Sequence, residues 1–305
     1  MTLPRRILIN PEVTPYYHCV SRCVRRAYLC GKDDLTGYDF EHRRGWIESR
    51  LLFLAKALCI DVRAYAIMSN HYHLVLHINK QALSALDDEC IVKQWQMLHH
   101  LPEWFDHPEV DENRIAATVA LWRERLGSIS WFMKSLNEPL ARLANKEDDC
   151  KGRFWEGRFK SQALLDEVSV LKCMAYVDLN PTRANVAKTP ETSDHTSIQA
   201  RIEGRDQALA PLSGQSGDTF AIPISKEHYL NLVDWTGRHL RPDKRGSIQP
   251  NLPPILQRLQ QSPNHWKDEL SNLTRRYARA IGDPASLLNY RDWLGQSLLN
   301  GVTTV

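Results

Sequence analysis

Two histidines separated by a single residue form the most distinctive chemical group in this sequence. His71 and His73 flank Tyr72 within a stretch of β-branched and aromatic residues. In a strand, successive side chains point to opposite faces, so both imidazoles would project from the same face. Imidazoles arranged in this way can hold one divalent cation together. The alternative is two surface histidines on an exposed sheet face, because His-x-His is a common spacing by itself.

Tyr176 and Asn180 form a second candidate pair. Their four-residue spacing would stack them on one face of a helix, with Cβ atoms about 5–6 Å apart. The carbonyl oxygen of Asn180 is a hard ligand suited to Mg²⁺ or Mn²⁺, and the phenol of Tyr176 would then lie beside the cation. The alternative is a core tyrosine followed by an asparagine that ends the helix before Pro181.

A repeated glycine-arginine-phenylalanine motif is the third signal. It runs from Gly152 to Phe159 and reads GRFWEGRF, with Lys160 directly after it. Arg153, Arg158 and Lys160 could neutralise phosphates, while the interleaved aromatic rings could stack on unpaired bases. The alternative is a core strand whose aromatic residues face inward and whose arginines are solvated.

The elements that position these residues are expected from the spacing of apolar residues. The pattern predicts a strand, a helix, two strands around a turn at Ser69-Asn70, a mainly helical region, an extended segment and a short helix. Their expected ranges are 16–22, 41–58, 62–78, 82–148, 150–166 and 167–179. This order is typical of an α+β domain, in which helices pack against a small antiparallel sheet.

The remaining third of the chain has a different composition. Residues 188–218 are rich in Thr, Ser, Asp, Gly and Pro, which is typical of a linker after a first domain, 1–187. Residues 219–305 are expected to form a helical accessory region. Arg275, Arg276 and Arg279 lie at helical spacing there, which gives either a DNA-binding face or a solvated one.

Composition places few limits on the partner. The formal net charge of the 305 residues is only +3, which neither requires nor excludes nucleic acid. No window approaches the ~18 apolar residues of a membrane span, and no signal peptide is evident, so a cytoplasmic location without membrane contact is expected. The seven cysteines lack paired C-x-x-C spacing, which favours buried free thiols in a reducing compartment.

Four blocks, taken together, resemble the REP-associated tyrosine transposases, which are single-tyrosine relatives of the HUH nucleases. The blocks occur in the order of that family and lie between residues 15 and 187. They read YYHCVSRCVRR, MSNHYHLVL, GRFWEGRFKSQ and MAYVDLNPTRANV. The resemblance implies a ferredoxin-like core with a helical C-terminal extension. It also places the first strand before a basic turn, where Arg22, Arg25 and Arg26 become candidate DNA contacts.

Carried onto this sequence, the resemblance assigns His71 and His73 to a Mg²⁺ or Mn²⁺ site, completed by Asn180, and assigns Tyr176 as the nucleophile. It implies cleavage of single-stranded or hairpin DNA, at repetitive extragenic palindromes, through a covalent 5′-phosphotyrosine by a monomer or homodimer. Tyr72 departs from the aliphatic residue usual between the histidines, but it suits a sheet face. Tyr65 is a weaker candidate for the nucleophile.

Two other functions stay open at this point. One is a hairpin-binding protein that keeps the fold but does not cut, although the intact set of two histidines and Tyr176 favours an enzyme. The other is a metal-dependent hydrolase without a covalent intermediate, which would not need Tyr176. The absence of a G-x-x-x-x-G-K-[ST] loop agrees with a reaction that uses no nucleotide cofactor. The sequence does not identify the base that activates the tyrosine.

Overall fold

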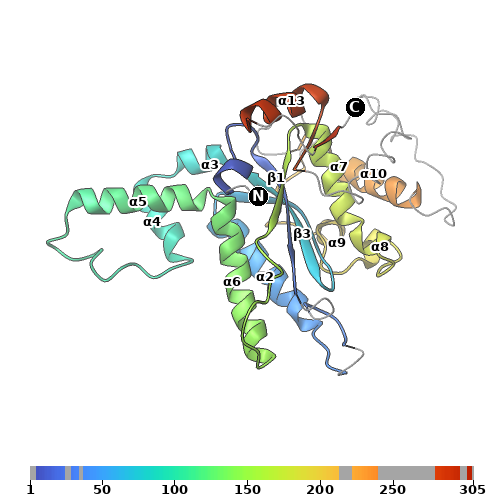
Figure 1. Cartoon of the computed structure of the whole chain (residues 1–305), viewed down its shortest axis with the longest axis horizontal. Coiled ribbons are helices and arrows are strands. Elements are labelled where there is room, and N and C mark those ends of the chain that lie inside the picture. Colours follow the sequence, from blue (N-terminus) through green and yellow to red (C-terminus); the bar gives the residue numbers. More distant parts are fainter. Residues whose placement is uncertain are drawn as a thin grey trace.

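A six-stranded sheet organises the part of the chain described by the computed structural model, which comprises residues 5–24, 29–33, 37–212, 222–239, 279–295 and 301–303. The strands lie in the order β2-β3-β1-β4-β5-β6 (Figure 1). Their bounds are Tyr16–Arg22 (β1), Ile60–Ile67 (β2), His71–Ile78 (β3), Lys160–Leu164 (β4), Ala280–Gly282 (β5) and Gly301–Thr303 (β6). The first four strands pair antiparallel, whereas β5 joins β4, and β6 joins β5, in parallel.

The β2–β3 hairpin confirms the pair of strands expected around Ser69-Asn70. Its residues alternate between two faces, as a pleated strand requires. Tyr72 and Leu74 pack in the core on one side of the sheet, whereas Val75 packs on the other. β3 is hydrogen-bonded to β2 on one edge and to β1 on the other, so it lies inside the sheet. The histidines of β3 therefore occupy an interior antiparallel strand.

Two long helices cover one face of the sheet. They are α2, His42–Ala57, and α6, Ile129–Glu147. Leu51 and Leu54 of α2 and Phe132 and Leu136 of α6 share a buried apolar core with Tyr72. This packing fits the helices expected from the apolar spacing of 41–58 and of the region after residue 82. A short N-terminal helix, α1, spans Arg5–Leu8.

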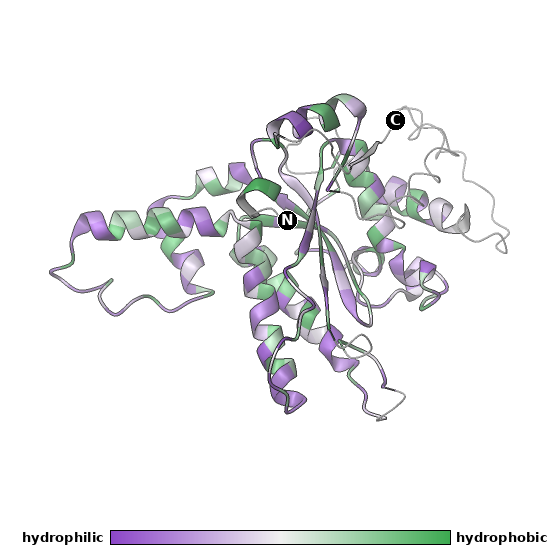
Figure 2. Cartoon of the chain, viewed as in Figure 1, coloured by the Kyte–Doolittle hydropathy of each residue, from purple (hydrophilic) through white to green (hydrophobic). Residues whose placement is uncertain are grey.

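Three helices between β3 and α6 project away from the sheet (Figure 1). They are α3, Lys80–Ala85; α4, Asp88–Gln96; and α5, Glu112–Leu126. Polar and apolar residues are mixed along them (Figure 2). Trp95 of α4 and Trp122 of α5 stack with ring centroids 5.2 Å apart, so aromatic packing joins the two helices.

The opposite face of the sheet is covered by α7, Glu167–Asp178, and α10, Lys226–His239, packs against α7. Val170 and Met174 of α7 pack with Val75 of β3 and with Tyr229 of α10. Asp166 caps α7 by accepting a hydrogen bond from the backbone N–H of Ser169 at 2.6 Å, which fixes where the helix begins. α7 thus lies directly over the face that carries the histidines.

The chain after α7 is more ordered than the composition of 188–218 suggested. It forms α8, Asn180–Arg183, a 3₁₀ turn, Pro190–Thr192, and α9, Ser197–Ile202. Ser197 Oγ accepts from the backbone N–H of Tyr65 at 2.9 Å, and Ile198 is fully buried. The hydroxyl of Ser197, in a segment whose composition suggested a linker, therefore contacts β2. How the chain divides into domains, with boundaries at 187 and 218, stays a prediction.

The last part of the chain adds strands as well as helices. Besides β5 and β6 it contains α13, Pro284–Trp293. Arg279 precedes β5, whereas Arg275 and Arg276 lie outside the described residues. All seven cysteines are free, but Cys150 is exposed and Cys90 is half-buried, so the expectation of buried thiols was wrong for these two. No described helix has both the length and the hydropathy required to cross a bilayer.

Candidate active site

Strand register gathers the candidate residues on the face of the sheet beneath α7. β1 and β3 pair so that Val20 lies opposite His73 and Arg22 lies opposite His71. On the other side of β1, Val20 lies opposite Lys160 of β4. Because paired residues point to the same face, the two histidines and two cationic side chains share one surface.

These residues line a cavity of about 380 Å³. Six of the residues expected at the site lie around it together: Arg22, His71, His73, Arg158, Lys160 and Tyr176. The remaining lining residues are Val20, Glu156 and Gly157. Three exposed cations against one exposed carboxylate make the mouth of this cavity attractive to an anion.

Four other expected residues are not part of that lining. Asn180 begins α8, and its Nδ2 lies 3.5 Å from the backbone oxygen of Tyr176, a weak hydrogen bond within the helix terminus. Arg153 is exposed and lies outside the cavity lining. Arg25 and Arg26 fall outside the described residues.

His18 is the residue that sequence reasoning missed. It lies on β1 two residues before Val20, is 3% exposed, and stacks on His73 with ring centroids 5.1 Å apart. Its Nε2 lies 2.9 Å from Nδ1 of His73, and its Nδ1 lies 3.2 Å from Oε1 of Gln162 on β4. Alternation along YYHCVSR would have placed His18 on the face of Arg22, but only the register brings it to His73.

The two histidines of β3 are oriented by different neighbours. Nδ1 of His71 lies 2.5 Å from Oδ1 of Asn70, and the rings of His71 and His73 meet edge to face at 4.8 Å. Within the described part of the chain, Nδ1 is thus the hydrogen-bonded nitrogen of both rings. Nε2 is the nitrogen left for a ligand.

Burial keeps these imidazoles neutral. It lowers the pKa of His18 to about 4, although the Gln162 hydrogen bond opposes the shift. Burial, helped by the nearby charge of Arg22, also lowers the pKa of His71 to about 4. Burial is also the main reason why the pKa of His73 lies well below its usual value. Neutral imidazole is the form that binds metal, so the site is in its ligand form at neutral pH.

Tyr176 projects from α7 against this histidine cluster. It is 8% exposed, and its ring meets those of His73 and His18 edge-on at 5.7 and 6.0 Å. Burial raises the pKa of the phenol, while the guanidinium of Arg183, 4.9 Å from the ring centroid, and a hydrogen bond from Asn180 oppose the shift. The phenol is therefore protonated at neutral pH.

The donor set fits a divalent cation that also takes ligands from solvent and substrate. Two neutral imidazoles are available at the cavity, with the amide of Asn180 at the start of the next helix. Among the described residues, no group of three His, Cys, Asp or Glu side chains could hold a metal ion. The expectation of Mg²⁺ or Mn²⁺, which often retain water and bind substrate phosphates, stays a prediction.

The segment that contains the GRF repeat is firmly attached beside the cavity. Trp155 Nε1 donates to the backbone oxygen of Asn137 at 2.9 Å, and the N–H of Glu156 donates to the oxygen of Arg22 at 2.8 Å. Only Lys160–Leu164 is a strand, so the expectation of an extended element from residue 150 was wrong for its first half. Phe154 faces inward, whereas Phe159 is half-buried.

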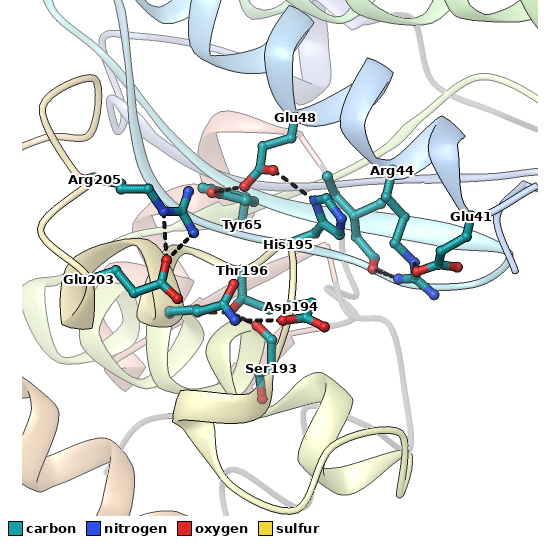
Figure 3. Close-up of polar contacts among 12 residues, drawn as sticks. Glu41, Arg44, Glu48, Tyr65, Ser193, Asp194, His195, Thr196, Glu203 and Arg205 are labelled. Carbon is teal, nitrogen blue, oxygen red and sulfur yellow. Dashed lines mark hydrogen bonds and ion pairs between the residues drawn. The ribbon is translucent and has the colours of Figure 1, made fainter.

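Tyr65, the weaker candidate for the nucleophile, lies elsewhere. Its side chain packs on the α2 side of the sheet, and its hydroxyl donates to Glu48 at 2.5 Å (Figure 3). Glu48 also bonds Nδ1 of His195 at 2.7 Å, which ties the segment before α9 to α2. This cluster is separated by the sheet from the cavity beneath α7.

Comparisons with known proteins give little beyond this geometry. No family model and no curated protein matches the sequence. A solved structure described as a REP-associated tyrosine transposase bound to a REP hairpin is similar with a TM-score of 0.40 and 13% identity. The match covers 72% of this chain and 96% of that one. It is a distant structural likeness.

Proposed function

We propose that this chain is a metal-dependent enzyme that breaks and rejoins single-stranded or hairpin DNA through a covalent link to Tyr176. One observation carries the proposal. The phenol of Tyr176, two neutral imidazoles and three cationic side chains surround a single cavity. The sequence blocks that resemble REP-associated tyrosine transposases support the same conclusion, with palindromic repeats as the substrate and a monomer or homodimer as the active species.

The proposed reaction conserves a phosphoester bond. The phenolic oxygen of Tyr176 forms a bond to phosphorus as the bond to the 3′ oxygen breaks, which leaves a 5′-phosphotyrosine and a 3′-OH. The phenolic proton goes to solvent, and the leaving oxygen takes one from solvent. Reversal with a 3′-OH rejoins the strand without a nucleotide cofactor.

The cationic residues bind and orient the phosphate. Arg158 and Lys160 are exposed at the mouth of the cavity, where they can neutralise the backbone on either side of the reacting phosphate. Arg183 lies over the phenol ring and favours its ionised form. His71 and His73 would hold a divalent cation, which would supply Lewis acidity toward a non-bridging oxygen.

His18 and Gln162 are proposed as positioning residues. If Oε1 of Gln162 accepts the proton of His18 Nδ1, then His18 Nε2 accepts from Nδ1–H of His73. This chain of hydrogen bonds holds His73 in the tautomer whose Nε2 carries a lone pair. Outer residues of this kind orient metal-binding histidines and raise their basicity.

The proposal is tested with a labelled palindromic oligonucleotide, Mn²⁺ and three proteins. Wild type should give a DNA-linked species that survives denaturation and disappears on protease treatment. Tyr176→Phe keeps the ring and loses only the hydroxyl, so it should give none, yet still retard the hairpin on a native gel. Tyr65→Phe, which also loses one phenolic hydroxyl, should give the adduct as wild type does.

Each other outcome identifies a different function. An adduct that persists in Tyr176→Phe would move the nucleophile to another tyrosine. Cleavage by wild type without any adduct would indicate a hydrolase that uses water. Binding without cleavage by wild type would indicate a protein that only binds hairpins.

A further inference from the structure

A second groove lies next to the candidate active site. One face of α6, from Ser130 to Asn145, forms one wall, and the segment from Trp155 to Phe159 forms the other. The residues of α6 that line the groove recur at spacings of three and four, so a single stripe of this helix faces the groove along about four turns. Its volume is about 420 Å³, which is similar to that of the site cavity.

The groove and the site cavity share a wall. Gly157 and Arg158 line both of them. Asn145 Nδ2 donates to the oxygen of Gly152 at 3.0 Å, and further bonds hold Trp155 and Glu156, so this segment is anchored at several points. The segment forms a fixed ridge between the two cavities, which a DNA strand can cross.

The charge of the groove matches a polyanion. Lys134, Arg142 and Arg158 are exposed around it, against a single carboxylate, Glu138, which pairs with Arg142. The site cavity on the other side of the ridge is also lined by more cations than carboxylates. A polyanion lying across the ridge would therefore meet a positive surface along its whole path.

Aromatic residues distinguish this surface from a simple phosphate-binding face. Trp155 and Phe159 are both half-buried and line the groove together with the cations. Unpaired bases stack on such rings, whereas the bases of a duplex already stack on one another. A second copy of this chain is a poorer occupant, because a two-fold contact would place Lys134 and Arg142 near their own copies.

We propose that this groove binds the unpaired DNA segment that flanks the phosphate in the site cavity. The proposal rests on the proposed function, since it assigns the path of the same substrate. In it, Lys134 and Arg142 contact phosphates and Phe159 stacks on a base. The ridge at Gly157 and Arg158 marks the passage from the reacting phosphate to the bound flank.

The test compares two DNA hairpins that differ only in an unpaired flank. Binding of full-length protein is measured over a range of salt, without divalent cation so that no cleavage competes. The double variant Lys134→Gln, Arg142→Gln should weaken binding of the flanked hairpin and lower its salt slope by about 1.4, or about 0.7 for each lost phosphate contact. Binding of the hairpin without a flank should not change.

Matched variants separate local contacts from total charge. Lys93→Gln with Arg205→Gln removes the same charge from exposed, ion-paired residues elsewhere, and it should leave the preference for the flank intact. Phe159→Leu keeps an apolar side chain and loses the ring. This variant should weaken binding of the flanked hairpin by about tenfold, the effect of losing one stacked base.

Three results would overturn the inference. Equal weakening of both hairpins by Lys134→Gln, Arg142→Gln would mean that the groove contacts duplex. Unchanged binding of both hairpins by this variant would mean that the groove does not contact DNA. A change in the sedimentation of the variant would make the groove a contact between copies of the chain. If wild type binds neither hairpin, the proposed function fails and this inference fails with it. The other three results leave the proposed function standing and reject only the groove.

Discussion

The phenol of Tyr176 lies among rings that also form the candidate metal site. His73 and His18 contact it edge-on, and the guanidinium of Arg183 lies over its ring, 4.9 Å from the centroid. A side chain enclosed in this way cannot reorient freely, so its oxygen is presented in one direction. At the scale of single residues, the site is therefore preorganised, and the residues behind the proposed metal ligands become the ones to test.

Replacing His18 by phenylalanine should reduce metal affinity without unfolding the protein. Phe fills the buried space of the imidazole but cannot bond Nδ1 of His73, which now lies 2.9 Å from His18. We expect Mn²⁺ affinity, measured by calorimetric titration, to fall roughly 10- to 100-fold. The double variant His71→Ala, His73→Ala should abolish Mn²⁺ binding and DNA cleavage. It should still retard the hairpin on a native gel.

The control for this experiment is His99→Phe, a histidine beside the projecting tryptophans. It should bind Mn²⁺ as wild type does. Equal Mn²⁺ affinity in His18→Phe and wild type would show that His18 only packs against His73. In that case the outer chain through Gln162 has no part in holding the cation.

Residue types and spacing, taken together with the family resemblance, made His71, His73 and Tyr176 candidates, and the structure gathers these three at one cavity. They could be found because two-residue and helical spacings are local. His18 could not be found, because its role depends on how β1 registers against β3, more than 50 residues away along the chain. Register depends on packing across the whole sheet, which local spacing does not encode.

α7 is anchored close to the tyrosine it carries. Asp178, two residues after Tyr176, is fully buried and accepts from the hydroxyl of Tyr229 at 2.5 Å and from the N–H of Ile198 at 2.9 Å. It also accepts from the hydroxyl of Ser197. One carboxyl group thus joins α7 to both α9 and α10, which fixes the helix that carries Tyr176.

This carboxyl should make stability fall as pH rises through mildly acidic values. Burial raises the pKa of Asp178 from 3.8 to about 6. The folded state therefore binds more protons than the unfolded state between these values. Its contribution to the free energy of unfolding is complete below about pH 4 and is lost as the pH rises through about 6. The full change is about 3 kcal/mol.

Urea denaturation of Asp178→Asn checks this linkage. From pH 4 to pH 7, the free energy of unfolding of wild type should fall relative to that of the variant by about 2.4 kcal/mol, most of the full change. Asp106→Asn, at an exposed carboxyl, should keep a constant difference. Parallel curves for wild type and Asp178→Asn would mean that Asp178 has the same pKa folded and unfolded.

At the scale of elements, periodic segments were predictable and irregular ones were not. The hairpin around Ser69-Asn70 and the helix now called α7 were expected directly from alternation and from Pro181. Residues 150–159 lack regular structure because side-chain and backbone bonds to α6 and β1 hold them, as with Asn145 and Gly152. α9 was missed because it follows a Ser- and Thr-rich segment that suggests a linker, whereas the hydroxyl of Ser197 bonds to the backbone of Tyr65 in β2.

The whole molecule shares one sheet between the N-terminal region and the C-terminal part of the chain. β5 pairs with β4, and Ile281 is 1% exposed in the core with α7. Ile281→Ala should therefore lower the free energy of unfolding of the entire protein by about 2–5 kcal/mol. Denaturant unfolding monitored by fluorescence and by circular dichroism should show one shared transition.

The control for this prediction is Leu288→Ala, on the exposed side of α13, where 51% of the residue is accessible. It should change the free energy of unfolding by less than about 0.5 kcal/mol. Two separate transitions, with only one altered by Ile281→Ala, would mean that residues after 218 form an independent domain.

The pairing of β4 with β5 has a consequence for synthesis. At about 5–20 residues per second, a ribosome needs on the order of ten seconds to add the chain between these strands. During that interval β4 is an open edge, the kind of strand that recruits other chains. β4 begins with Lys160, Ser161 and Gln162, polar residues that make such recruitment unfavourable while the nascent chain waits for its neighbour.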